Sequence, residues 1–284
     1  MALSLGIEYG VAVWRTALLE HLVPIETKAF AHAEDVRGYV EGICACYPEP
    51  VIAVAIQHGH DCRVQGAEAD EMEEVRGTIE AIKAMNLTSY RLPEVRELAS
   101  IPRYRKLNRA HMGTAGVLCS TATLLYRLRL QEAAWPEIRF LFLSIDEKSR
   151  NIVVIQEGQI VDGIARPLHE ALYQETADDE VRQLVEAAFW EGLSQDLAGL
   201  MAIHHCEDIV LLTHKQPAGM RWLHDEIVTR LSDLYPCYLF PTSTAEQDDF
   251  EAAIGAGIIV EGLHHNDVAG EVVERLHLVH LPHL

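Results

Sequence analysis

Residues 5–20 read LGIEYGVAVWRTALLE, and the fold can be predicted from this stretch outward. An apolar run reaches a glycine-containing turn and alternation then resumes, which predicts two short strands joined as a hairpin. One acid, Glu8, stands between Gly6 and Gly10 near the end of the first strand. Glu8 is therefore either a functional carboxylate, next to glycines that let a ligand approach the backbone closely, or a solvent-facing residue on an edge strand.

Composition and charge exclude several classes of protein. The chain has 284 residues, 49% of them hydrophobic, which suits one large core or two linked domains. A net charge of −20, from 23 basic and 43 acidic residues, argues against nucleic-acid binding. No apolar run approaches the length of a membrane span, and the N-terminus lacks the features of a secretion signal. Six cysteines without a CxxC pair indicate free thiols, so a cytoplasmic location is expected.

Strand and helix patterns alternate along the chain in an order that repeats. No obvious sequence repeat is present, yet a hairpin followed by strand–helix units occurs at the N-terminus and again from about residue 137. This order predicts two α/β halves with a cleft between them. Strands are expected in residues 3–20, 50–57, 137–146, 151–164, 208–214 and 236–241, and helices in residues 32–47, 69–85, 113–131, 177–203, 219–235, 249–263 and 267–277.

Five stretches in one order resemble the predicted butyrate-kinase-like proteins, a family of unknown function of the DUF1464 type. That family lies in the superfamily of acetate kinases, sugar kinases, heat-shock ATPases and actin. The resemblance implies an α/β fold of two ribonuclease-H-like domains with mixed sheets flanking a central cleft. We place these domains at residues 1–135 and 136–284, with the last helix packing back on the first domain. The stretches are residues 5–20, 101–125, 152–164, 208–214 and 251–263.

The resemblance also implies a nucleotide and metal site. In the first hairpin, Gly6 and Gly10 would admit the phosphates of ATP, and Glu8 would reach Mg²⁺ directly or through water. In the run at residues 152–164, Asp162 would share the Mg²⁺ and Gly163 would admit phosphate. Glu8 stands where the family usually has Asp.

Further residues receive roles from the same resemblance. Residues 108–116, NRAHMGTAG, match a family stretch except that His111 replaces an acid and Gly116-Val117 replaces Asp-Lys. Arg109 or His111 would face the acceptor, with His111 acting as a base. For the glycines and alanines of residues 252–257, tight helix packing is an open alternative to nucleotide contact. The remaining nucleotide contacts implied are Gly113, Thr114, Thr213, Gly255, Ala256 and Gly257.

The function that the resemblance implies is ATP-dependent phosphoryl transfer to a small carboxylate or hydroxyl acceptor. Four of the five stretches depart from the family pattern at a residue expected to touch phosphate, metal or acceptor, which favours weak, altered or absent phosphoryl transfer. The alternative is a degenerate, non-catalytic nucleotide-binding or interaction module of the same fold. A metal site among the fifteen histidines is a third hypothesis. The expected partners are a nucleotide and a small acceptor, and a homodimer is left open.

Overall fold

The chain divides into two compact units. The computed structural model describes residues 3–10, 13–47, 50–56, 69–146, 148–172, 178–213, 220–241, 249–265 and 267–284. Unit 1 is built from the described parts of Met1–Ser100, Thr114–Ala133 and Phe250–Leu284, and unit 2 from Ile101–Gly113 and Ala134–Asp249. The chain passes between units near the predicted boundary, at Ala133, but also after Ser100, Gly113 and Asp249. Both C-terminal helices, rather than the last alone, therefore belong to unit 1.

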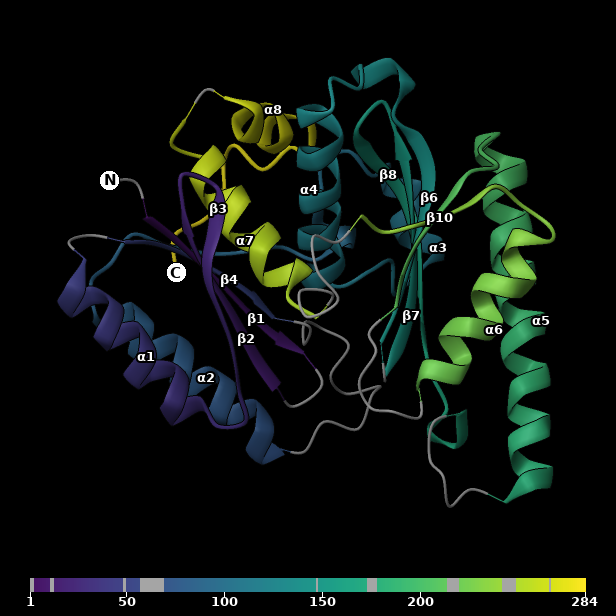
Figure 1. Ribbon diagram of the computed structural model, residues 1–284, viewed down its shortest axis with the longest axis horizontal. Helices are drawn as coiled ribbons and strands as arrows, with labels where there is room; N and C mark the ends of the chain where they lie inside the picture. Colours follow the sequence, from purple (N-terminus) through teal and green to yellow (C-terminus); the bar gives the residue numbers. More distant parts are fainter. Residues whose placement is uncertain are drawn as a thin grey trace. The chain divides into compact units, whose positions relative to one another are not determined.

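Unit 1 is a five-stranded mixed sheet with helices on both faces. Its strand order is β3-β2-β1-β4-β5, with β1 antiparallel to β2 and parallel to β4. Helices α1 and α2 lie on one face of this sheet and α7 on the other (Figure 1). The strands are β1 Leu3–Gly10, β2 Val13–Glu20, β3 Val23–Phe30, β4 Val51–Ile56 and β5 Ser89–Arg91; the helices are α1 Ala33–Cys46, α2 Ala69–Ala84, α4 Ala115–Leu130, α7 Glu251–Gly262 and α8 Val268–Arg275.

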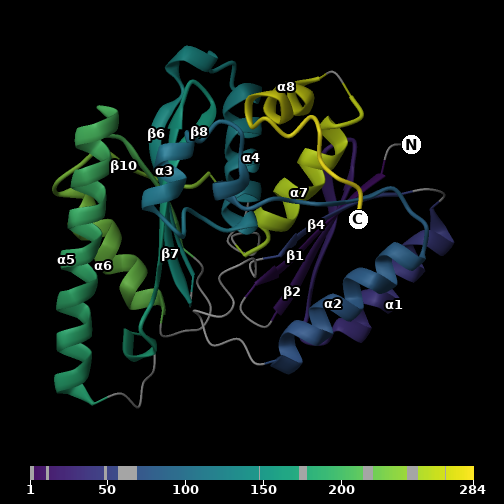
Figure 2. The same ribbon diagram turned by 180° about the vertical axis from the view of Figure 1, so that it is seen from behind.

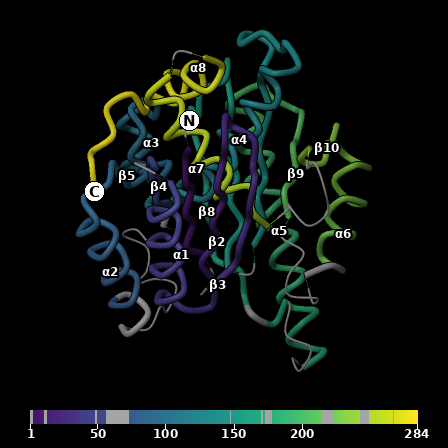
Figure 3. Tube along the Cα trace, turned by 60° about the vertical axis from the view of Figure 1, so that its left-hand side comes forward, coloured from purple at the N-terminus to yellow at the C-terminus, as the bar shows by residue number. Residues whose placement is uncertain are grey.

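Strand β1 is buried on both faces and divides the core of unit 1 into two layers. Leu5 and Ile7 pack in a cluster with residues of α1 and α2. Because side chains alternate along a strand, Gly6 and Glu8 point to the opposite face, toward α7 and α4. The C-terminal residues run beside β5 (Figure 3), where Leu284 N donates to Ser89 O at 2.9 Å.

Unit 2 repeats the topology of unit 1. Its strand order read from β8 is β8-β7-β6-β9-β10, which corresponds strand for strand to the sheet of unit 1. Helices α5 and α6 lie together on one face of this sheet (Figure 2). Both units therefore have the ribonuclease-H-like topology, and the predicted fold class is confirmed. The elements are α3 Arg103–Asn108, β6 Arg139–Ile145, β7 Ser149–Gln156, β8 Gln159–Pro167, α5 Asp179–His204, β9 Ile209–Thr213, α6 Met220–Ser232 and β10 Cys237–Leu239.

Most predicted elements agree with the structure within a few residues, with two instructive differences. The run at residues 151–164 contains two strands, β7 and β8, joined where Glu157 and Gly158 both adopt positive φ. Strand β3 was not predicted, because Pro24 and the polar residues after it obscure the alternation of apolar and polar residues. Proline is tolerated there because β3 is an edge strand. Among the described residues, no helix combines the length and the apolar character that crossing a membrane requires.

Close backbone packing holds α7 against β1. A Cβ placed on Gly6 would lie 1.8 Å from Ala253 O and 2.6 Å from Gly257 N, both in α7. No side chain fits in that space, so only glycine allows the helix to approach the strand this closely. In this structure Gly6 therefore accommodates α7 of the protein itself.

We expect Gly6→Ala to destabilise unit 1 by about 1–3 kcal/mol, because the added methyl group forces α7 away from β1. Gly38→Ala is the matched control, since a Cβ at that exposed position of α1 meets nothing within 4 Å. There we expect no loss, or a gain of about 0.5–1 kcal/mol from helix propensity. Urea unfolding would measure both variants. Equal stability of the Gly6→Ala variant and the wild type would contradict the packing role.

Candidate functional site

Glu8 is a buried acid paired with an arginine of its own hairpin. Glu8 is 3% exposed and lies directly opposite Arg15 in the pairing of β1 with β2. Arg15 Nη1 lies 3.4 Å from Glu8 Oε2 and donates to Gly10 O at 3.4 Å. Because β1 is a central strand, the alternative that Glu8 faces solvent on an edge strand is wrong. The charge of Glu8 is compensated within the hairpin.

The carboxylate of Glu8 also lies beside the first turn of α4. A Cβ on Gly116 would lie 3.4 Å from Glu8 Oε1. Thr114 is the N-cap of α4, and its hydroxyl accepts from Val117 N at 3.2 Å. A helix N-terminus carries a partial positive charge that stabilises a neighbouring carboxylate. Burial, and secondarily the charge of Glu8, raises the pKa of the Cys119 thiol well above its usual range.

Gly113 and the small residues of α7 also have structural explanations. Gly113 has φ of 134°, a conformation that favours glycine, directly before the Thr114 cap. All twelve residues of α7 are buried. A Cβ on Gly255 would lie 1.8 Å from Cys119 O, and one on Gly257 would lie 2.6 Å from Leu19 Cδ1. Gly255, Ala256 and Gly257 thus bring α7 against α4 and β2, as the packing alternative anticipated. Their adenosine role stays a prediction, and their burial argues against it.

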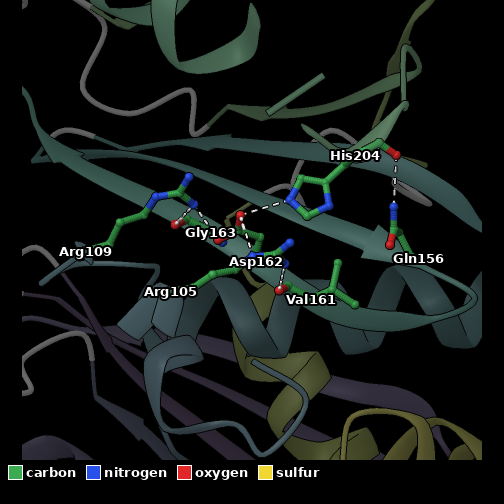
Figure 4. A network of polar contacts seen from close by, with 7 residues as sticks. All are labelled: Arg105, Arg109, Gln156, Val161, Asp162, Gly163 and His204. Carbon is green, nitrogen blue, oxygen red and sulfur yellow. Dashed lines mark hydrogen bonds and ion pairs between the residues drawn. The ribbon is translucent and has the colours of Figure 1, made fainter. Parts of the chain in front are cut away.

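Asp162, the second predicted metal ligand, is the centre of an ion-pair network in unit 2 (Figure 4). It is 1% exposed on β8 and forms an ion pair with Arg109. His204 Nε2 lies 2.9 Å from Asp162 Oδ2, and Arg105 Nε lies 3.5 Å from the same oxygen. Burial by itself would raise the pKa of Asp162. The hydrogen bond with His204, the charge of Arg109, the Gly163 N–H and the charge of Arg105 outweigh burial and lower that pKa below its ordinary value.

Residues 101–113, which carry Arg105 and Arg109, cover the open edge of β8. Arg105 Nη1 donates to Val161 O at 2.7 Å, and Arg109 Nη1 donates to Gly163 O at 3.2 Å. Ala165 N donates to the carbonyl of His111 at 3.1 Å. A Cβ on Gly163 would lie 2.0 Å from Met112 O, so this glycine admits the covering backbone. Residues 101–113 thus satisfy edge groups that an uncovered strand leaves unpaired. The guanidinium of Arg109, predicted to face an acceptor, binds Asp162.

Sequence reasoning missed Asp146, which follows β6 directly. Its carboxylate accepts from Lys148 N at 2.8 Å and from Ser149 N at 2.7 Å, at the start of β7. Ile145 is paired in register with Thr213, so Asp146 and Thr213 lie at the carboxyl ends of adjacent parallel strands. This is where open α/β sheets usually bind ligands. Thr213 contacts His224 Nδ1. The sequence signal that could have identified Asp146 is an acid directly after a buried strand.

The histidine hypothesis finds no support in the described part of the chain. No group of three or more His, Cys, Asp or Glu residues is arranged there to hold a metal ion. His264 Nε2 instead lies 3.3 Å from the Tyr90 hydroxyl, and the His283 ring lies 4.6 Å from the Tyr90 ring, centroid to centroid. His58 and His60 lie outside the described residues.

Comparison with known proteins supports the fold and a partial family relationship. A family model described as a protein of unknown function, DUF1464, matches residues 50–190, just under half of the 284 residues. No curated protein matches the sequence. The likeness to butyrate kinases in particular is not shown by this match.

Solved structures resemble the chain over nearly its whole length at low identity. The PilM–PilN type IV pilus biogenesis complex matches with a TM-score of 0.52 and 12% identity, over 95% of this chain and 98% of that chain. A polyphosphate/ATP-glucomannokinase from Arthrobacter sp. strain KM matches with a TM-score of 0.46 and 15% identity, over 93% and 100% of the two chains. The chain has the actin-like ATPase fold. At these identities the likeness shows the fold and no specific activity.

Asp162→Asn tests the ion-pair network. We expect it to lower the free energy of unfolding by about 3 kcal/mol near neutral pH, because it leaves the partly buried Arg105 and Arg109 without their buried carboxylate partner. A lowered folded-state pKa means that Asp162 stabilises the protein above the unfolded-state value near pH 4. That contribution is lost as pH falls from about 4 through the lower folded-state pKa. The stability difference between wild type and variant should therefore shrink below about pH 4 and close below the folded-state pKa.

Glu226→Gln is the control for Asp162→Asn. It removes an exposed pair between Glu226 and Arg230 on α6, whose expected contribution is below about 1 kcal/mol. Unfolding by denaturant at a series of pH values measures both variants. A difference between wild type and Asp162→Asn that does not change with pH would contradict the network.

Proposed function

We propose that this chain is a non-catalytic binding module of the actin-like ATPase fold rather than a magnesium-dependent phosphotransferase. The observation that carries the proposal is the pairing of both predicted metal ligands. Glu8 lies opposite Arg15 in unit 1, and Asp162 pairs with Arg109 in unit 2. Mg²⁺ needs carboxylate oxygens that are open to it. An arginine beside each carboxylate competes electrostatically with a cation for the same oxygens.

The donor set therefore does not fit a magnesium ion. For Asp162, a metal would have to replace contacts with His204, Arg105 and Arg109 in a buried place. Removing one partner from such a network is costly, because the remaining charges lose their compensation. The glycines predicted to admit phosphate meet a related difficulty, since the space beside Gly6 and Gly163 holds protein backbone.

Two departures from the family pattern compensate one another in unit 1. Gly116 stands where the family has Asp, and a Cβ at this position would lie 3.4 Å from Glu8 Oε1, which is an ordinary van der Waals contact. An Asp at position 116 would place a second carboxylate beside Glu8, which is unfavourable for both. These substitutions are what a site converted from metal binding to internal pairing would show.

A binding role is compatible with this fold. The PilM–PilN complex, which has the highest TM-score of the matches described above, is named for type IV pilus biogenesis rather than for an enzymatic reaction. By analogy alone, the present chain would act through a partner or ligand. Its expected cytoplasmic location and a homodimer remain predictions.

Phosphoryl transfer to a small carboxylate or hydroxyl acceptor is the second candidate. The observation in its favour is the position of Asp146 and Thr213 at the carboxyl ends of β6 and β9. In this candidate ATP and Mg²⁺ are bound at that edge of the unit 2 sheet. The two candidates differ in whether nucleotide binding requires magnesium.

Calorimetry separates the candidates. We expect the full chain to give no magnesium-dependent heat of ATP binding at millimolar nucleotide, because both predicted metal ligands are already paired. Elemental analysis of untagged protein should likewise give no stoichiometric metal. Magnesium-dependent binding of ATP would overturn the proposal.

If such binding occurred, Asp146→Asn would locate it. Loss of binding in that variant, with binding kept in the exposed control Glu34→Gln on α1, would establish the second candidate. Circular dichroism of each variant would show that the fold is intact.

A further inference from the structure

Two arginines of unit 2 share one carboxylate. Arg150 on β7 and Arg166 on β8 lie directly opposite each other in the pairing of these strands. Asp196 of α5 accepts from both: Arg150 Nη2 at 2.7 Å, Arg166 Nε at 3.2 Å and Arg166 Nη2 at 3.1 Å. Among the side chains that the structure describes at this place, two positive charges therefore meet one negative charge, which leaves an excess of one positive charge.

The excess is unfavourable at Arg150, which is buried, whereas water reaches the Arg166 side chain. Like charges directly opposite each other in a sheet destabilise it. Arg150 is 4% exposed, and its Nε has no hydrogen-bond partner among the residues that the structure describes. Burial lowers the pKa of Arg150, Asp196 opposes that effect, and the charge of Arg166 lowers the pKa further. A buried donor without a partner is uncommon in native proteins and indicates a missing group.

A cavity of about 560 Å³ lies beside these charges. Ala188 and Gly192, one turn apart on α5, leave space there, and a Cβ on Gly192 would lie 3.2 Å from Arg150 Nη2. Leu172, Val185 and Phe189 also line the cavity. Its lining therefore combines charged and apolar side chains, and its volume lies in the range of sites for small organic molecules.

His169 adds a polar group to the lining. Its Nδ1 accepts from Ala171 N at 3.2 Å. A neutral ring that accepts at Nδ1 carries its proton on Nε2, so the second nitrogen is a hydrogen-bond donor. The polar groups of the cavity are thus donors in excess, in a chain whose net charge is −20.

We propose that the cavity between α5 and the β7–β8 hairpin binds an organic monocarboxylate with a bulky apolar body, either aromatic or of medium chain length. One carboxylate balances the excess charge, and arginine is the residue best suited to bind it. A multiply charged phosphate would overcompensate and would leave the apolar wall without contacts. A very short acid would fill only a small part of the volume. The site lies entirely in unit 2 and does not depend on the proposed function.

Calorimetry of the full chain at low salt tests the site with benzoate, octanoate, neutral benzamide and inorganic phosphate. We expect both carboxylates to bind, benzamide to bind at least tenfold more weakly than benzoate, and phosphate to show no saturable binding. Arg166→Gln should weaken benzoate at least tenfold. Arg166 is 58% exposed at its side chain, so the variant is expected to fold.

Two further variants separate charge from shape. Arg76→Gln on α2 makes the same change of charge at another exposed arginine and should leave benzoate binding unchanged. Ala188→Leu adds bulk at an exposed position lining the cavity and should weaken octanoate without altering charge. Equal affinity for benzoate and benzamide, no effect of Arg166→Gln, or no carboxylate binding at 10 mM to folded wild type would each overturn the proposal.

Discussion

The close backbone contact between α7 and β1 is the constraint on which the other features of unit 1 depend. Gly6 of β1 and Gly255 of α7 have no side chains, and backbone of a neighbouring element occupies the space that a side chain would need. The helix can therefore lie against the sheet and against α4 at once. The face of β1 that carries Glu8 is closed by this contact. A glycine pattern that resembles a nucleotide site in sequence thus serves the interior of the protein.

Charge pairing is the second organising feature. Buried acids in both units have arginine partners: Glu8 with Arg15, Asp162 with Arg109, and Glu251 with Arg127. In a chain with 43 acidic and only 23 basic residues, a substantial share of the arginines serves such internal pairs. A buried pair contributes little net stability but is costly to break. Arg150 and Arg166 differ from these one-to-one pairs, because the two arginines share the single carboxylate of Asp196.

The order of strands and helices could be predicted because buried strands read as short apolar runs and helices as longer periodic ones. Strand β3 could not, since an edge strand with proline and polar residues lacks that signal. The site was less predictable. The partners of Asp162 come from residues 105, 109 and 204, and nothing local in the sequence indicates that they meet. A glycine needed for packing and a glycine needed for phosphate look the same in sequence, so only the surrounding atoms distinguish them.

The discontinuous course of the chain bears on how the protein folds during synthesis. All segments of unit 2 have been made once residue 249 has emerged, whereas unit 1 still lacks α7 and α8 at that point. Until α7 emerges, that helix cannot cover the face of β1 that carries Glu8. The contacts between β1 and α7 join residues well over two hundred positions apart in the sequence. Contacts of such long separation form slowly. Unit 2 is therefore expected to fold first, and strand β1, which precedes all of unit 2 in the chain, would be among the last strands to be fully enclosed.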